Sequence, residues 1–117
     1  MTIDAKTFFS AMANEIRLRS LLLLQLQGEL CVCELTYALG LSQPMISRHL
    51  ALLRETNIVQ TRRNGQWMYY TIHPDLATWA QNVLSETAHA NKRTAPFSED
   101  LRSLKNMPNR PGSACCA

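Results

Sequence analysis

The sequence predicts a mainly α-helical domain that carries one β-hairpin. Three observations favour this class. Apolar residues recur at helical spacing over most of residues 5–56, Asn64-Gly65 joins two strand-like runs, and a further amphipathic segment starts at Pro74. A length of 117 residues allows one compact domain with a core of its own and is too short for two.

Two helices are expected at the start of the chain, over residues 5–12 and 15–26. Asn14 lies between them and is suited to cap the second by accepting backbone hydrogen bonds, while Gly28 marks its end. Apolar side chains cover more than one stripe of the second helix, so we expect it to be the central core helix. They are Ile16, Leu18, Leu21, Leu22, Leu24 and Leu26.

Two shorter helices are predicted next, separated by a tight turn. A short apolar piece, residues 30–32, leads into a helix over 34–39 that Gly40 closes. The second helix covers residues 43–56, with Ser42 as its N-cap. At 100° per residue, its apolar side chains share one face. They are Ile46, Leu50 and Leu53.

The hairpin follows, with strands expected at residues 58–62 and 67–72 around Asn64-Gly65. This dipeptide is a strong hairpin signal because both residues tolerate a positive φ. The helix that starts at Pro74 has a large apolar face for so late a segment, which implies a partner helix. It includes Leu76, Trp79, Ala80, Val83 and Leu84.

The chain becomes polar and proline-containing after Lys92. We therefore expect two parts, a folded domain over residues 1–92 and a flexible tail over 93–117. A short helical piece near residues 101–104 is the one regular element expected in this tail.

The order of two short helices, a glycine-containing turn and a basic hairpin is that of a winged helix-turn-helix, in which the second helix enters the major groove of double-stranded DNA. Polar side chains that can contact base edges and phosphates lie on the exposed face of helix 43–56 and near the hairpin tip. The candidates are Ser42, Gln43, Ser47, Arg48, His49, Arg62 and Arg63. For each one, the alternative is a polar residue that simply faces solvent.

The aromatic residues of the second strand, Trp67, Tyr69 and Tyr70, have two interpretations. They could stack on single-stranded nucleic acid, but aromatics in a strand more often pack, and we favour packing. The net charge of +3 permits an anionic partner without identifying one.

The four cysteines fall into two close pairs, Cys31/Cys33 and Cys115/Cys116. The first residues lack a basic start followed by a long apolar stretch, so we expect no secretory signal and a cytoplasmic protein. No apolar run is long enough to span a bilayer, so no membrane role is expected. Cysteines in the cytosol are kept reduced, and close pairs then indicate thiolate ligands more than structural disulfides.

At this point the sequence resembles the ArsR/SmtB family of metalloid- and metal-sensing repressors. The resemblance covers roughly residues 8–90 and depends on four segments, residues 13–19, 29–35, 41–54 and 63–70. It implies a homodimer joined by the first and last helices that binds a palindromic operator and represses a resistance operon. An enzyme such as an arsenate reductase is disfavoured, because no oxyanion-binding loop or thioredoxin-like C-x-x-C setting is present.

Glu-Leu-Cys-Val-Cys-Glu-Leu at residues 29–35 is similar to the arsenic-sensing branch, which implies that As(III) or Sb(III) binds the thiolates and releases the DNA. Soft sulfur ligands select soft ions. Cys31 and Cys33 share a face if the backbone is extended but lie about 200° apart in a helix, so chelation can compete with the DNA-bound shape. The expected inducer is therefore As(III) or Sb(III), with no organic cofactor.

One departure from the branch concerns the third ligand, because many relatives have a further cysteine where this chain has Tyr37. Cys115 or Cys116 of either subunit, a solvent thiol, or a two-coordinate site are all open. The alternative to metalloid sensing is a winged-helix regulator that responds to thiol redox state or to another soft metal ion.

Overall fold

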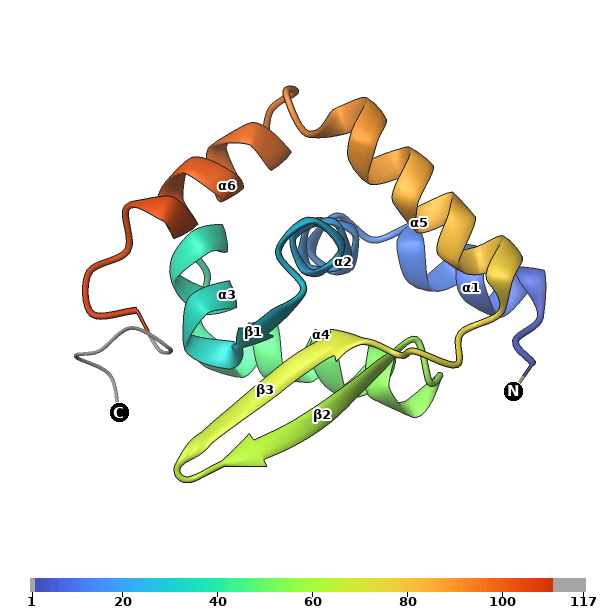
Figure 1. Ribbon diagram of the computed structural model, residues 1–117, viewed down its shortest axis with the longest axis horizontal. Helices are drawn as coiled ribbons and strands as arrows, with labels where there is room; N and C mark the ends of the chain where they lie inside the picture. Colours follow the sequence, from blue (N-terminus) through green and yellow to red (C-terminus); the bar gives the residue numbers. More distant parts are fainter. Residues whose placement is uncertain (1, 111–117) are drawn as a thin grey trace.

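The computed structural model describes residues 2–110, which form helices and a small sheet around one core (Figure 1). The predicted class, mainly α with a β-hairpin, is confirmed. The elements in chain order are α1 (Ala5–Met12), α2 (Glu15–Gln27), β1 (Glu29–Cys31), α3 (Val32–Leu39), α4 (Gln43–Glu55), β2 (Val59–Asn64), β3 (Trp67–Ile72), α5 (Thr78–Asn91) and α6 (Phe97–Lys105).

Helix α2 lies at the centre of the molecule, with the other helices around it (Figure 1). Its four successive leucines, residues 21–24, are all buried. Because successive helix residues point about 100° apart, this burial requires neighbours on every side. The prediction of a central core helix is therefore confirmed.

The predicted helix caps are present. The Asn14 Oδ1 atom accepts a hydrogen bond from the Arg17 N–H at 3.1 Å, and the Ser42 Oγ atom accepts one from the Met45 N–H at 3.4 Å. Gly40 ends α3 at φ +68°, a conformation that costs glycine little. Helix α3 begins two residues earlier than expected, because the Glu34 carboxylate accepts a hydrogen bond from the Cys31 N–H at 2.9 Å and closes its first turn there.

The three strands form an antiparallel sheet in the order β1-β3-β2. Asn64 pairs with Trp67, so the hairpin turn consists of Gly65 and Gln66, one residue later than the dipeptide suggested. Gly65 has φ +64°, which suits glycine at the first central position of a two-residue turn. The same sheet joins the hairpin to the residues that precede α3.

Helix α5 begins at Thr78, later than the predicted start at Pro74. The Leu76 N–H donates to the His73 carbonyl at 3.1 Å, which makes a turn of the residues before the helix. Within residues 2–110, no helix combines the length and apolar content needed to cross a membrane.

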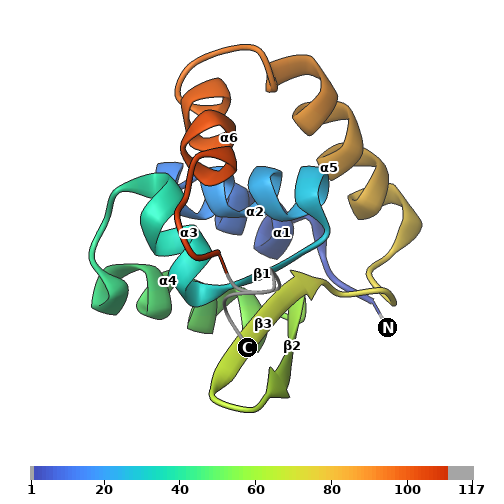
Figure 2. The same ribbon diagram turned by 60° about the vertical axis from the view of Figure 1, so that its left-hand side comes forward.

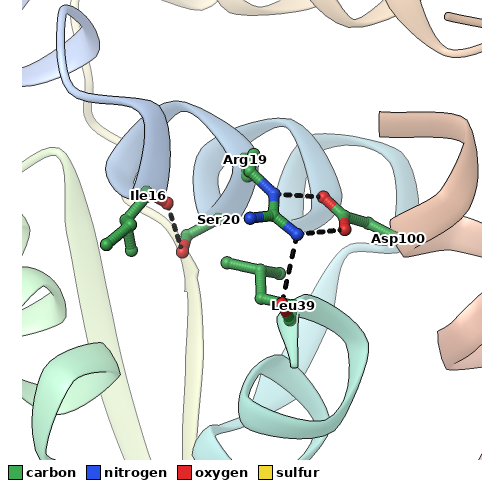
Figure 3. Close-up of polar contacts among 5 residues, drawn as sticks. All are labelled: Ile16, Arg19, Ser20, Leu39 and Asp100. Atoms are coloured by element: carbon green, nitrogen blue, oxygen red, sulfur yellow. Dashed lines mark hydrogen bonds and ion pairs between the residues drawn. The ribbon is translucent and has the colours of Figure 1, made fainter. Parts of the chain in front are cut away.

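Helix α6 is the main difference from the sequence analysis, which expected a flexible tail from residue 93. It packs against α2 and α3 (Figures 1 and 2), and it buries Asp100 and Leu104. Arg19 of α2 donates two hydrogen bonds to the Asp100 carboxylate, at 2.6 and 2.9 Å, and a third to the Leu39 carbonyl at 3.2 Å (Figure 3). This pairing fixes α6 to the core over residues that look solvent-facing in the sequence.

Candidate functional site

The outer face of α4 carries the polar residues predicted to contact DNA. Gln43 and Arg48 are exposed, and Ser47 and His49 are half-buried. The opposite face is core, because Ile46, Leu50 and Leu53 are fully buried as expected. Ser42 is exposed, but its hydroxyl already caps the helix. Helix α4 and the β2–β3 hairpin lie on the same side of the molecule, away from α5 and α6 (Figures 1 and 2).

His49 is held by a residue that the sequence analysis did not single out. Arg17 of α2 lies 3.2 Å from the His49 Nδ1 atom and also donates to the Ala11 carbonyl at 2.9 Å. Burial lowers the pKa of His49, and the neighbouring charges of Arg17 and Arg48 lower it further. The arrangement holds the imidazole on the α4 surface and favours its neutral form.

The two arginines of the hairpin differ in their surroundings. Arg63 is exposed. Arg62 donates two hydrogen bonds to Glu29 of β1, at 2.6 and 2.9 Å, and its guanidinium lies 4.8 Å from the centre of the Tyr69 ring. The hydrogen bonds from Arg62 lower the pKa of the Glu29 carboxyl. Glu29 therefore engages the charge of Arg62, which it would have to share with a phosphate.

The sulfur atoms of Cys31 and Cys33 lie within bonding distance of each other. Cys31 has an extended backbone at the N-cap of α3, whereas Cys33 lies in the first turn of that helix. The two sulfurs are joined as a disulfide, with the Cα atoms 5.4 Å apart. Cys31 has 0% exposure and Cys33 is half-buried. The start of α3 can thus point both sulfurs at one place, which is the condition for chelation by the reduced pair.

Cys31 also belongs to a row of residues that crosses the sheet. It pairs with Tyr69 of β3, and Tyr69 pairs with Arg62 of β2. Residues paired across antiparallel strands share a face of the sheet. The thiol pair and the hairpin arginine are therefore neighbours of the same tyrosine.

Glu34 connects the thiol pair to the end of the described chain. It is 2% exposed. Its Oε1 atom accepts the hydrogen bond from the Cys31 N–H, and its Oε2 atom accepts one from the Arg110 Nε atom. The sequence analysis missed both roles. The spacing of three residues between Cys31 and Glu34 is a signal for the cap, whereas nothing local marks Arg110, which lies 76 residues away.

A third ligand is missing from the described pair. Residues 2–110 contain no group of three or more His, Cys, Asp or Glu side chains that could hold a metal ion. Tyr37, one turn after Cys33, is 46% exposed and offers no thiolate. Cys115 and Cys116, the other predicted ligands, lie outside the described residues.

An aromatic patch lies where α1 meets α5. Phe8 is fully buried and packs edge-on against Trp79, with ring centres 5.2 Å apart. Phe9 and Trp79 lie 6.1 Å apart and remain 49% and 39% exposed. Large aromatic side chains left exposed together are typical of an interaction surface.

Comparison with known proteins gives the same picture. Residues 14–61 match the family described as "Bacterial regulatory protein, arsR family". The arsenic resistance transcriptional regulator ArsR1 of Pseudomonas putida is 48% identical over 93% of this chain and 84% of its own length. The arsenical resistance operon repressor of Escherichia coli is 49% identical over 67% of each chain.

Solved structures agree on the fold. HlyU of Vibrio cholerae superposes with a TM-score of 0.67 at 38% identity, covering 74% of this chain and 90% of its own. The antimony-specific repressor AntR gives 0.61 at 29% identity, over 71% and 72%. A homodimeric winged helix-turn-helix domain of Mycobacterium bovis gives 0.62 at 27%, over 75% and 78%.

The fold, the exposed polar face of α4 and these similarities all indicate a winged helix-turn-helix protein. The winged helix-turn-helix prediction is thereby confirmed, and the relatives are DNA-binding regulators and not enzymes. The chain belongs to the ArsR family of bacterial transcriptional regulators.

Proposed function

We propose that the chain is a cytoplasmic repressor of an arsenic-resistance operon, which binds palindromic operator DNA as a homodimer and is released when As(III) or Sb(III) binds the reduced Cys31/Cys33 pair. The observation that carries the proposal is the meeting of both sulfurs at the start of α3, the first helix of the DNA-reading pair. Relatives named for arsenic resistance and an antimony-specific neighbour support the choice of ion.

The DNA surface in this proposal consists of α4 and the hairpin. Gln43, Ser47 and Arg48 face base edges, since arginine can bind guanine and glutamine can bind adenine through paired hydrogen bonds. His49 and Ser42 lie at the rim, and Arg62 and Arg63 contact phosphates. Arg48→Ala is expected to weaken operator binding by about 1–3 kcal/mol, the range for one bidentate contact. Arg102→Ala on α6, which is equally exposed, serves as the matched control.

Release follows from the position of the pair. Helix α3 packs against α4 and is joined to it by the turn at Gly40. An ion that binds both sulfurs fixes the first turn of α3, and Cys31 must leave its buried position to receive it. If this geometry differs from the DNA-bound one, ion and DNA weaken each other by the same factor, typically 5- to 150-fold.

The homodimer is proposed from the aromatic patch of Phe9 and Trp79. A two-fold interface buries the same patch of both subunits, so one exposed aromatic surface suffices to build it. The homodimeric neighbour supports this assignment. It also matches a palindromic operator, whose two half-sites mirror the symmetry of a protein dimer.

The test is fluorescence anisotropy of a labelled duplex from the gene's own promoter. The chain is titrated onto the DNA in a phosphine reductant, which leaves no competing thiol, and arsenite is then added. Wild type should release the duplex, whereas Cys31→Ser/Cys33→Ser should bind it equally well and stay bound. Release of this variant by arsenite would remove the pair from the sensor.

A second candidate function, sensing of thiol redox state, is favoured by the disulfide between Cys31 and Cys33. Oxidation of two thiols by hydrogen peroxide yields one disulfide, and the peroxide is reduced to two waters. Peroxide should then release the duplex reversibly, and arsenite should have no effect on the reduced protein. The same anisotropy experiment separates the two functions.

A further inference from the structure

We propose that Arg17 sets the spacing between the two recognition helices of the dimer, because its guanidinium joins α1, which contributes to the proposed subunit interface, to His49 of α4. Arg17 is then a positioning residue for the recognition of a palindrome. The inference rests on the proposed function and adds to it the contact that determines which distance between half-sites the dimer accepts.

Arg17 closes the C-terminal end of α1 from the neighbouring helix. The last carbonyl groups of a helix have no partner inside it. The Arg17 Nε atom donates to the Ala11 carbonyl at 2.9 Å, and its Nη2 atom donates to the Ser10 carbonyl at 3.4 Å. Helix α1 has no basic residue in its own last turn, so α2 contributes the positive charge that a helix C-terminus favours. Phe9, the exposed aromatic residue of the proposed interface, directly precedes these two carbonyls.

A third nitrogen of the same guanidinium reaches α4. The Arg17 Nη1 atom lies 3.2 Å from the His49 Nδ1 atom, and the imidazole nitrogen accepts because arginine can only donate. His49 directly follows Arg48, one of the residues proposed to contact bases. One planar group therefore holds the backbone end of α1 and a side chain of the recognition helix at the same time.

The position of α4 relative to α1 depends on such a bridge, because the two helices leave an open cleft between them. The cleft has a volume of about 440 Å³ and is lined by α1 on one side and by Leu52 and Thr56 on the other. Both helices pack on α2, and the core contacts of α4 are apolar. Burial of apolar surface is non-directional, whereas a hydrogen bond requires a fixed distance and angle. Arg17 therefore adds a directional restraint where packing leaves freedom.

Such a restraint matters for a palindrome because its two half-sites have a fixed separation. They lie about one helical turn apart, roughly 34–36 Å or 10–10.5 base pairs. One added base pair moves a half-site by about 3.4 Å and turns it by about 34° around the DNA axis. A dimer whose recognition helices are fixed to the interface accepts one spacing and rejects its neighbours, whereas a dimer without the bridge can adapt α4 to more than one.

Anisotropy titrations of the full-length chain with a spacer series test the inference. The labelled duplexes carry the palindrome of the gene's own promoter, with its centre unchanged, lengthened by one base pair or shortened by one. The readout is the ratio of the affinities for the native and the altered spacings. Wild type should prefer the native spacing, and Arg17→Ala should lower the ratio roughly 2- to 30-fold, the range for residues that carry coupling between two sites.

The ratio separates positioning from two other roles of Arg17. A merely structural role lowers the active fraction of the protein, which weakens binding to every duplex equally. A direct phosphate contact also affects every duplex equally, and its loss makes the slope of log K against log salt less negative by about 0.9 for each subunit. Uniform weakening by either route, with the wild-type ratio retained, would overturn the inference.

Arg19→Ala is the matched control for a loss of stability. Arg19 lies on the same helix, but its guanidinium donates to Asp100 and to the Leu39 carbonyl and not to α1. This variant should be less stable than wild type and should keep the wild-type spacing ratio. An equal fall of the ratio in Arg17→Ala and Arg19→Ala would overturn the specific role of Arg17.

Two further variants test the geometry of the bridge. Arg17→Lys keeps the positive charge but has one nitrogen in place of the planar fork, so its ratio should fall as in Arg17→Ala. His49→Ala removes the acceptor on α4. The double variant Arg17→Ala/His49→Ala should have the ratio of Arg17→Ala alone, because both substitutions break the same link. Additive effects of the two substitutions would contradict the bridge.

Failure of the proposed function has a different signature. A chain that does not bind a palindrome as a dimer gives equal affinities for all three spacings already in wild type, and the inference then falls with the function. A wild type that prefers one spacing, together with an unchanged ratio in Arg17→Ala, would overturn the inference alone.

Discussion

His49 accepts a hydrogen bond from a side chain that can only donate. The Arg17 guanidinium carries no acceptor, so the Nδ1 atom at 3.2 Å must be unprotonated. The neutral ring then carries its proton on Nε2, the nitrogen that does not face Arg17. Arg17, which lies behind α4, therefore determines which ring nitrogen of His49 carries the proton.

The pKa of His49 leads to the first prediction. Burial and two nearby arginines lower it below the usual 6.5, so between the two values the unfolded chain binds more protons than the folded one. Stability is therefore fully present above pH 6.5 and falls as the pH drops toward the folded pKa. Urea unfolding from pH 7.5 to 5 should show a smaller loss in His49→Gln than in wild type.

The control for this series is His89→Gln, because His89 is an exposed histidine on α5. It should follow the wild-type pH dependence. Identical curves for wild type and His49→Gln would mean that Arg17 does not disfavour the charged ring.

The candidate residues fall into two groups, those whose environment depends on the local helix and those whose partners are distant in the sequence. The polar face of α4 could be predicted because helical periodicity separates Arg48 from Ile46 and Leu50. The partners of Glu34 and Arg62 could not, since each lies 33 to 76 residues away and is brought close only by the sheet and by α6. Sequence spacing predicts which side chains a helix exposes, but it does not predict which charged residues pair over long distances in the sequence.

At the scale of elements, β1 and the hairpin form one unit. Glu29 and Arg62 are joined by two hydrogen bonds across the middle strand, over the ring of Tyr69. Cys31 lies two residues after Glu29 on β1. A change at the thiol pair can therefore reach the hairpin through this ion pair as well as through α3.

Glu29→Gln tests the ion pair that joins β1 to the hairpin. The substitution removes a negative charge beside the hairpin, so Arg62 no longer shares its charge between Glu29 and a phosphate, and operator binding should tighten. A full phosphate contact by Arg62 in each subunit of the proposed dimer makes the slope of log K against log salt more negative by up to about 1.8, about 0.9 for each subunit. Anisotropy titrations from 50 to 300 mM salt provide the slope.

Glu86→Gln, at an exposed position of α5, makes the same charge change away from the hairpin and should leave the slope unaltered. A slope for Glu29→Gln equal to that of wild type would indicate that Arg62 does not reach the DNA even when released.

Helix α6 depends on one buried ion pair for its place. The side chains of Asp100 and Arg19 are 4% and 15% exposed. Removing one partner leaves the other charge buried, so Asp100→Asn should lower the free energy of unfolding by about 3 kcal/mol. Urea denaturation followed by circular dichroism measures the change. Glu99→Gln, an exposed neighbour on the same helix, should lower the free energy of unfolding by less than about 0.5 kcal/mol. Equal losses in the two variants would mean that the Arg19–Asp100 pair does not hold α6 in place.

Most element boundaries agree with the predictions, and two of the exceptions have a common cause. Helices α1, α2 and α4 follow from apolar periodicity and from caps at Asn14 and Ser42. The early start of α3 and the docking of α6 depend on the carboxylates of Glu34 and Asp100, both buried against expectation. The segment that forms α6 was predicted to be a flexible tail because the partners of its polar residues are contributed by other elements.

At the scale of the whole molecule, the surfaces proposed for DNA and for the partner subunit lie apart. Helix α4 and the hairpin occupy one side, while α1 and α5 meet on another (Figure 1). The thiol pair lies at the junction of β1 and α3, so it adjoins the proposed DNA-binding unit without belonging to either proposed surface. On the proposed function, induction would therefore change DNA affinity while the proposed dimer stays assembled.

The aromatic patch gives the last prediction. In a two-fold dimer each substituted residue lies near its own copy or the same apolar patch, so Phe9→Glu buries two added charges without partners. The variant should become monomeric at micromolar concentration in sedimentation velocity, and it should lose cooperative binding to a palindrome while retaining weak binding to a half-site. Tyr37→Glu, an equally exposed aromatic on α3, should remain dimeric. A dimeric Phe9→Glu chain would place the subunit interface elsewhere, and the palindrome would then have to be read by a different pairing of α4 helices.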